Sequence, residues 1–229
     1  MINHIGFIMD GNRRWARARG LPAFMGHKEG AQVIQKIVQA CSQNDIKHVT
    51  MYAFSLENFK RSEQEKQYLF KLVGTQLTNK QKEFIKNGVR VHFVGNRTLF
   101  PPQIQNAIKQ VEQKTSHCNT ITVHFLFCYG GQQEITAAAR TCAQQVVDGT
   151  IKIDQITPDY FAQQLWLNNC PPPDLVIRTG GDMRLSNFLS YQCAYSELLF
   201  TNTYWPDFNE QELEHILNQF QQRKRKFGA

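Results

Sequence analysis

The chain has 229 residues, of which 41% are hydrophobic and 11% aromatic. This is enough apolar material for a sizeable core, and its spread along the whole length argues against a disordered chain. No apolar stretch is long enough to cross a bilayer, and the N-terminus runs into a strand-like segment without the marks of a signal peptide. We therefore expect a soluble, cytoplasmic protein.

The formal net charge of +7 favours an anionic partner but does not identify it. Nucleic acid, an acidic membrane surface and phosphorylated metabolites all remain open on charge alone. The six cysteines include no Cys-x-x-Cys pair, so metal-ligand spacing is absent, and a chain of this length needs no disulfide framework. We interpret them as reduced thiols, mostly in the core.

Segments of strand and helix character alternate along the chain. In order, the sequence predicts a strand at 5–9, helices to 18 and at 31–41, a strand at 48–54, a helix at 63–86, a strand at 89–94, a helix at 102–114, a strand at 121–127, a helix at 133–147, a short helix opening at 157, strands at 174–177 and 198–201, and a helix from 209 to about 226. This alternation favours parallel pairing with right-handed crossovers, and no linker divides the chain. We predict one α/β domain over residues 1–229, with a central, mostly parallel six-stranded sheet flanked by helices.

Polar and charged residues gather where three predicted strands end, at 10–15, 55–61 and 178–187. In open parallel sheets, ligands bind beyond these carboxyl ends. In the first loop, Gly11 permits a tight turn, Arg14 can donate a forked pair of hydrogen bonds to phosphate, and Asp10 could hold a divalent cation that bridges to it. A capped helix with a solvated arginine pair explains this loop alone about equally well.

The loop after the fifth strand shifts the balance towards a phosphate site. Arg178 and Arg184 can converge only if the glycine pair between them folds back, and Ser186 adds a hydroxyl donor. The alternative is that these arginines are surface charges. Glu197 offers a second carboxylate for a metal ion. His27 could contact phosphate or transfer a proton, although a lone histidine is more often structural.

The sequence contains neither a nucleotide-binding P-loop nor a nucleophile elbow. Taken together, its loops resemble the cis-prenyltransferase family, and within it the undecaprenyl diphosphate synthases. The blocks that carry the resemblance are Ile8-Met9-Asp10-Gly11-Asn12, Gly26-His27-Lys28, Tyr52-Ala53-Phe54-Ser55, Tyr129-Gly130-Gly131, Arg178-Thr179-Gly180-Gly181, Arg184-Leu185-Ser186-Asn187 and Trp205-Pro206-Asp207-Phe208. They occur in order over essentially the whole chain.

The resemblance implies a Mg²⁺-dependent enzyme that condenses isopentenyl diphosphate onto an allylic diphosphate, usually farnesyl diphosphate. The product would be a long cis-polyprenyl diphosphate such as undecaprenyl diphosphate, which is the lipid-carrier precursor for cell-wall polysaccharide, including peptidoglycan. It further implies a homodimer with at most peripheral membrane contact for product release. Nothing in it implies nucleic-acid binding.

The resemblance also implies a role for each matching residue. Asp10 would be the metal-linked catalytic carboxylate, Glu197 would share the metal, and Asn58 would act in catalysis from the mobile loop that also carries Arg61 and Glu65. The implied substrate-binding residues are Gly11, Asn12, Arg13, Arg14, Trp15 and His27 for the allylic diphosphate, Arg178, Arg184 and Ser186 for isopentenyl diphosphate, and Ser55, Glu57, Phe59 and Arg61 on the covering loop.

Several positions depart from the family pattern. Arg13 stands where many bacterial members have glycine, Ala23 stands where an arginine often assists the allylic diphosphate, and Asp182-Met183 replaces Glu-His. Gln132 replaces an arginine, Phe59 a tryptophan, and the tail Lys226-Phe227-Gly228 has lysine for arginine. We expect altered substrate affinity, and any metal role at the histidine position is in doubt.

Two alternatives remain beside the enzyme. A non-catalytic partner subunit of the same fold would lack the loop residues that this chain retains. A nucleic-acid-binding protein would account for the basic charge, but the cations gather in loops with glycines and carboxylates rather than along one stripe with exposed aromatic rings.

Overall fold

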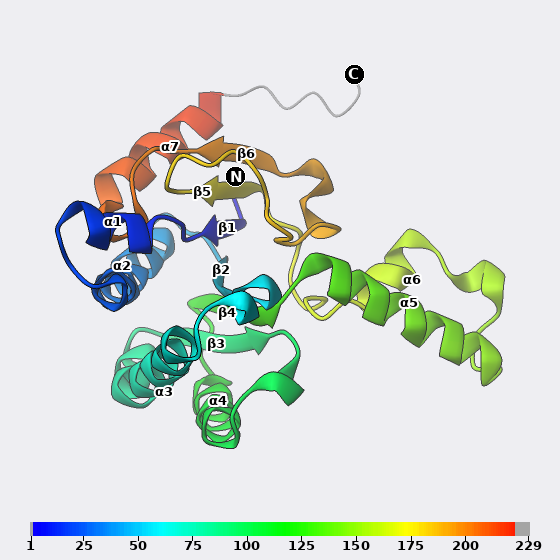
Figure 1. Ribbon diagram of the computed structural model, residues 1–229. Coiled ribbons are helices and arrows are strands. Elements are labelled where there is room, and N and C mark those ends of the chain that lie inside the picture. The colour runs from blue at the N-terminus through cyan, green and yellow to red at the C-terminus, as the bar shows by residue number, and fades with distance from the viewer. Residues whose placement is uncertain (1, 223–229) are drawn as a thin grey trace.

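The computed structural model describes residues 2–222 and contains one six-stranded sheet (Figure 1). The strands are β1 (His4–Ile8), β2 (His48–Ser55), β3 (Val89–Val94), β4 (Ile121–Tyr129), β5 (Leu175–Arg178) and β6 (Glu197–Phe200), in the order β3-β4-β2-β1-β5-β6. Every neighbouring pair runs parallel. The predicted fold class is therefore confirmed, and the sheet is parallel throughout.

The predicted helices are also present, and their described ends lie within a few residues of the prediction, except that the helix predicted at 31–41 begins at Ala23. They are α1 (Asn12–Ala18), α2 (Ala23–Gln43), α3 (Glu63–Lys86), α4 (Pro102–Thr115), α5 (Gly131–Val147), α6 (Pro158–Gln163) and α7 (Glu210–Gln222). The end of the predicted last helix and the tail Lys226-Phe227-Gly228 lie outside the described residues. In the part of the chain that is described, no helix is both long and apolar enough to cross a membrane.

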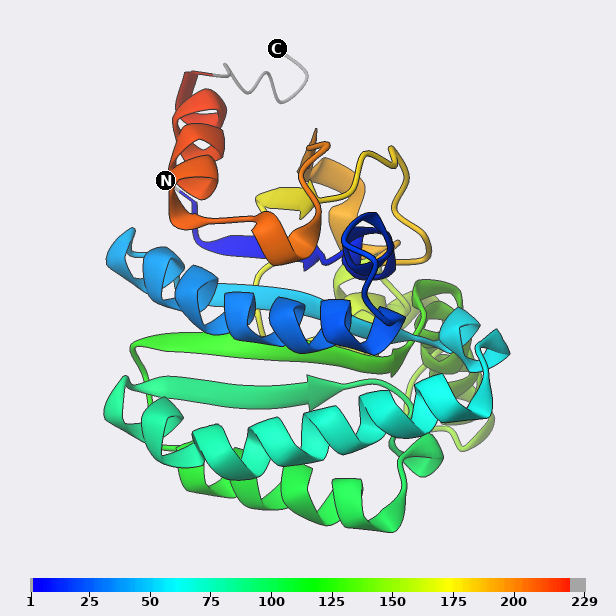
Figure 2. The same ribbon diagram turned by 60° about the vertical axis from the view of Figure 1, so that its left-hand side comes forward.

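The two faces of the sheet are covered by different parts of the chain. Helices α2, α3 and α4 lie across one face, and α7 packs against α2 (Figure 2). The segment that links β5 to β6 contributes Phe188 and Leu189 to the other face, while α5 and α6 extend away on that side (Figure 1). Because both faces are covered at the centre of the sheet, β1 and β5 are completely buried, whereas the edge strand β6 is partly exposed.

The strand order places a topological switch point between β1 and β5. From β1 the chain crosses to β2 on one side, and from β5 it crosses to β6 on the other. The two connections leave in opposite directions and cover opposite faces, so a crevice opens beyond the carboxyl ends of these strands, where ligands of open α/β sheets bind. Asp10 follows β1 and Thr179 follows β5 at this point.

Candidate active site

A single cavity of about 650 Å³ runs from this crevice between α2, α3 and the sheet. Its mouth is polar and includes Asp10, Asn12, His27, Ser55, Asn58, Arg61, Arg178, Arg184 and Ser186. Most of its interior is apolar and includes Ile34, Val38, Leu69, Val73, Leu77, Phe93, Val123 and Phe125, although polar side chains such as Gln35, Gln76 and Lys80 also line it. Nine of the predicted site residues, distant in sequence, therefore line one cavity that also has a long apolar compartment.

Asp10 and Arg178 form the floor of the polar mouth. Arg178 Nη2 donates to Asp10 Oδ2 at 2.9 Å, and Arg14 Nη2 lies 3.2 Å from Asp10 Oδ1. Burial raises the pKa of Asp10, but the hydrogen bond from Arg178 and the charge of Arg14 outweigh it, so the net pKa lies below its ordinary value. Asp10 is therefore ionised at neutral pH.

Thr179 holds the backbone of Asp10 in place. Its hydroxyl donates to the Asp10 carbonyl oxygen at 2.7 Å and accepts from the Asp10 N–H at 3.0 Å. Thr179 is completely buried, so water does not compete for these bonds. Sequence reasoning assigned it no role, although its place directly after Arg178 in the Arg-Thr-Gly-Gly block was an available signal.

The glycine pair after Thr179 folds the chain back on itself. Gly180 and Gly181 have φ angles of +87° and +84°, a region that favours glycine. As a result Arg178 Nη1 donates to Ser186 Oγ at 2.7 Å and also to the Arg184 carbonyl oxygen. The convergence of Arg178, Arg184 and Ser186 that a second phosphate site required is therefore present.

Asp182 lies among the same arginines. Its carboxylate contacts Arg184 at 3.0 Å, Arg14 at 3.4 Å and Arg178 at 3.6 Å. Three arginines thus surround two carboxylates, Asp10 and Asp182, and one nitrogen of Arg14 touches both. The sequence marked Asp182 only as a departure, whereas the structure makes it part of this charge cluster.

Asn12 and His27 line the same cavity because α2 approaches α1 closely. A Cβ atom on Gly26 would fall on the Asn12 carbonyl oxygen, so only glycine permits this packing. Among the described residues, four buried side-chain polar atoms lack a hydrogen-bond partner, and three belong to residues of this cavity: Asn12 Oδ1, His27 Nε2 and Arg178 Nε. Unsatisfied buried polar atoms are rare, and their concentration here indicates a polar ligand.

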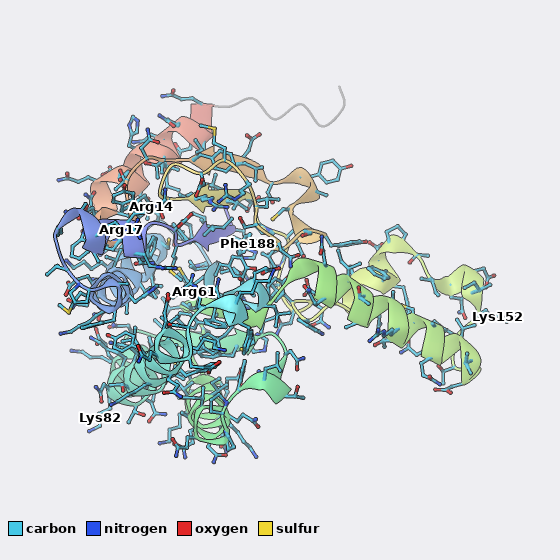
Figure 3. The ribbon with its side chains drawn as sticks, in the orientation of Figure 1. Arg14, Arg17, Arg61, Lys82, Lys152 and Phe188 are labelled. Atoms are coloured by element: carbon cyan, nitrogen blue, oxygen red, sulfur yellow. The ribbon has the colours of Figure 1, made fainter. Side chains whose placement is uncertain are left out.

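A second group of charged side chains lies at the mouth of the cavity, near the start of α3. Arg61 donates to Glu65 at 2.9 Å, His27 Nε2 lies 3.4 Å from the same carboxylate, and Arg13 lies 3.9 Å from it. Burial and the charge of Arg61 lower the pKa of His27 to about 4, so His27 is neutral at pH 7. Figure 3 labels Arg61 in this group, together with Arg14 on α1.

Ser55 and Asn58 sit on the turn between β2 and α3. The Ser55 N–H donates to Asn58 Oδ1 at 3.2 Å as part of a reciprocal cap on the 3-10 helix η1 (Leu56–Lys60). Glu57 instead accepts from Asn187 at 2.8 Å, which ties this turn to the segment after β5. The cap fixes the orientation of the Asn58 amide at the mouth.

Two predicted binding residues point elsewhere. The Trp15 indole N–H donates to Asp207 at 2.7 Å, and Arg19 stacks on the ring at 4.3 Å, so Trp15 anchors α1 rather than lining the cavity. Phe59 packs in an aromatic cluster with Phe54 and Phe70, with ring centroids 5.2 and 6.5 Å away. Because both side chains are held by structural contacts, the placement does not support substrate binding by either.

Glu197 lies at the wrong end of its strand to share a metal with Asp10 in the same chain. It pairs with Leu175, which pairs with Ile5, at the amino end of the sheet. Three further residues, about 10 Å of strand, separate this position from the carboxyl end. The sequence revealed the strand but not its register, which separates Glu197 from Asp10 within one chain, and a metal role for Glu197 stays a prediction.

Comparison with known proteins decides the family. Residues 8–228 match the family model described as "Putative undecaprenyl diphosphate synthase". The chain belongs to this prenyltransferase family. It is 42% identical over 229 residues to an isoprenyl transferase of Clostridium perfringens, covering 100% of this chain and 90% of that protein.

Two further proteins are similar to this chain. The (2E,6E)-farnesyl-diphosphate-specific ditrans,polycis-undecaprenyl-diphosphate synthase of Micrococcus luteus is 41% identical over 226 residues, covering 99% of this chain and 91% of its own. Lavandulyl diphosphate synthase from Lavandula x intermedia, solved in complex with dimethylallyl diphosphate, superposes with a TM-score of 0.96 at 33% identity, covering 100% of this chain and 98% of its own. The resemblance inferred from the motifs is confirmed.

Proposed function

We propose that this cis-prenyltransferase condenses isopentenyl diphosphate onto an allylic diphosphate primer, with farnesyl diphosphate as the preferred primer. The observation that most strongly supports this proposal is the form of the cavity, in which a mouth rich in arginine opens into an apolar compartment. An anionic head with a long hydrocarbon tail matches both halves. A nucleic acid would leave the apolar half unused.

The two diphosphates would occupy opposite sides of Asp10. Asn12, Arg14 and His27 would hold the allylic diphosphate, with backbone N–H groups at the start of α1; the Gly11 N–H itself donates to Asp10 Oδ1 at 2.6 Å. Arg178, Arg184 and Ser186 would hold the diphosphate of isopentenyl diphosphate. The unsatisfied Nε of Arg178 is a donor that such an anion would engage.

The residues present fit a Mg²⁺ ion at the mouth. Asp10 is ionised, lines the cavity and retains 31% side-chain exposure, and Mg²⁺ is commonly held by one or two carboxylates together with substrate phosphate oxygens. Asp182 offers a second carboxylate, because it contacts Arg14 and Arg178, the arginines that also contact Asp10. When bound, the ion would neutralise charge on the departing diphosphate.

The proposed reaction needs no protein nucleophile. The carbon–oxygen bond of the allylic substrate breaks, and its electron pair leaves with the diphosphate, whose growing charge Arg14 stabilises. The terminal alkene carbon of isopentenyl diphosphate attacks the allylic carbon, and the proton then lost from C2 of the isopentenyl unit passes to an oxygen of the departing diphosphate as the new double bond forms. Fixing both diphosphates sets the two carbons at attack distance.

The apolar compartment would receive the growing chain. It extends from the mouth along α2 and α3, and between the two helices Lys80 donates to Gln35 at 2.7 Å and to Glu83 at 3.0 Å. A long cis-polyprenyl diphosphate such as undecaprenyl diphosphate, for use in cell-wall polysaccharide synthesis, is the product that we propose. The six free cysteines support action in the reducing cytoplasm. We also propose that the protein acts as a homodimer with peripheral membrane contact at most.

Incubation with farnesyl diphosphate, radiolabelled isopentenyl diphosphate and Mg²⁺ tests the proposal. The wild-type protein should form labelled lipid, and Asp10→Asn should lose at least about 100-fold in turnover while folding normally. The exposed Asp45→Asn serves as the matched control and should retain wild-type rates. Equal rates in Asp10→Asn and wild type would refute the assigned role.

A further inference from the structure

A row of histidines crosses the face of the sheet opposite the cavity. His4, His48, His92 and His124 come from β1, β2, β3 and β4, and the rings of neighbouring histidines lie 5.6 to 6.1 Å apart. His4 is fully engaged, because its Nδ1 pairs with the Pro171 carbonyl oxygen and its Nε2 with Thr50, both at 2.7 Å. Among residues 2–222, the ring nitrogens of the other three pair only with one another.

His48 and His124 are diagonal neighbours on adjacent strands, since His48 pairs with Thr122 and His124 with Thr50. His48 Nδ1 lies 3.3 Å from His124 Nε2. Cys170, in the segment between α6 and β5, completes the group, and the three donor atoms all lie within 4.8 Å of one another. Sequence spacing does not reveal this set, because it comes from two strands and a loop.

We propose that His48, His124 and Cys170 bind a transition-metal ion, with Zn²⁺ as the best fit. Tetrahedral Zn²⁺ with Zn–N bonds of about 2.0–2.1 Å places two ligand nitrogens about 3.3 Å apart, which matches the observed pair. Two imidazoles and one thiolate are the donors that such borderline ions select, whereas Mg²⁺ prefers oxygen. This site is separate from the proposed prenyl-transfer chemistry.

His92 is a positioning residue for this site. Its Nδ1 lies 3.4 Å from His124 Nδ1, on the side of the ring away from His48. A hydrogen bond donated by His124 Nδ1 to His92 would fix the tautomer that presents the Nε2 lone pair to the ion. Metal-bound histidines almost always have such a second partner on the other ring nitrogen.

Coordination needs the lone pairs of two neutral imidazoles and a thiolate sulfur, so binding of the ion would displace the Cys170 thiol proton to solvent as the metal–sulfur bond forms.

A second cavity, of about 230 Å³, adjoins the three histidines His48, His92 and His124 and reaches Asn169. It provides room for a water molecule or another small donor as a fourth ligand. The ion would connect the segment before β5 to β2 and β4. Metal binding should therefore stabilise the fold and raise its melting temperature.

Titration of the metal-free, full-length protein with Co²⁺ tests the proposal, because a cobalt–thiolate bond has a distinctive near-ultraviolet charge-transfer band. One equivalent of Co²⁺ should produce this band and raise the melting temperature, and Zn²⁺ should displace Co²⁺. Cobalt bound at Asp10 would have oxygen ligands and no such band. Absence of the band in wild type would overturn the proposal.

Variants assign the ligands. His124 is 1% exposed, so half-buried positions are the safer ones to change. Cys170→Ser should abolish the band. His92→Asn should weaken Co²⁺ binding about 10–100-fold, and His48→Asn should weaken it at least as much. The exposed His117→Asn and the buried Cys142→Ser should bind like wild type. A band that persists in Cys170→Ser, or that Zn²⁺ fails to displace, would contradict the assignment.

Discussion

Replacement of Arg178 by lysine separates the role of charge from the role of geometry in the candidate site. Arg178 is the most deeply placed cation there, with a side chain only 4% exposed. Its guanidinium donates to Asp10 at 2.9 Å and to Ser186 at 2.7 Å, and its Nε faces no protein partner. A lysine ammonium retains the positive charge but cannot reproduce three donors in a fixed plane.

The expected loss follows from the donors removed. In Arg178→Lys the ammonium can still pair with Asp10, so the carboxylate remains ionised. The donor to the substrate diphosphate is lost, and removal of one such donor costs about 3–4 kcal/mol of barrier, or about 100- to 1,000-fold in kcat. The KM for isopentenyl diphosphate should rise as well, because the ground-state diphosphate uses the same donor.

Steady-state incorporation of radiolabelled isopentenyl diphosphate measures both constants, and circular dichroism checks the fold. Arg97→Lys, which changes an arginine paired with Glu112 outside the cavity, is the matched control and should remain within about twofold of wild type. If Arg178→Lys folds normally and retains wild-type kcat and KM, Arg178 does not bind the diphosphate as we propose.

Three other changes probe the packing, the protonation and the apolar compartment. Gly26→Ala forces a Cβ atom onto the Asn12 carbonyl oxygen, so the free energy of unfolding measured in urea should fall by about 1–3 kcal/mol, and turnover should fall with it. An unchanged urea midpoint of unfolding would contradict the close approach of α1 and α2. The pKa of His27 lies near 4 in the folded protein and near 6.5 in the unfolded chain, so its contribution to stability is complete above pH 6.5 and is lost as the pH falls to 4. His27→Asn should therefore flatten the pH dependence of the unfolding free energy in this window, and an identical slope would refute burial of a neutral ring. Val73→Phe narrows the apolar compartment and should shorten the product seen by thin-layer chromatography, whereas the exposed Val147→Phe should not. Equal product lengths in the two variants would show that Val73 does not line the path of the growing chain.

Local patterns predicted much of the fold and of the cavity mouth. The helix over 63–86 matches α3, and Thr157 caps α6 as expected, accepting from the Tyr160 N–H at 3.1 Å. Asp10 and Arg178 were placed at strand ends by the apolar runs before them, and the rule for parallel sheets then brought the two loops together.

Register and side-chain direction were not predictable in the same way. The sequence located the strand of Glu197 but not its pairing with Leu175, and this pairing places Glu197 at the other end from Asp10. The indole of Trp15 turns outward to Asp207, a partner 192 residues away. Such contacts depend on how distant elements pack, which no short window encodes.

The histidine row shows the same limit. His48 and His124 are 76 positions apart, and they are neighbours on one face only because β2 pairs with β4 rather than with β3. The absence of a Cys-x-x-Cys pair excluded a metal site assembled from one local motif. It could not exclude one assembled across the sheet.

The most direct test of the central claim is a single product analysis of the purified wild-type protein. After incubation with farnesyl diphosphate, Mg²⁺ and labelled isopentenyl diphosphate, we expect a long lipid diphosphate in which every newly formed double bond is cis. Folded protein that leaves the label entirely in isopentenyl diphosphate would contradict it.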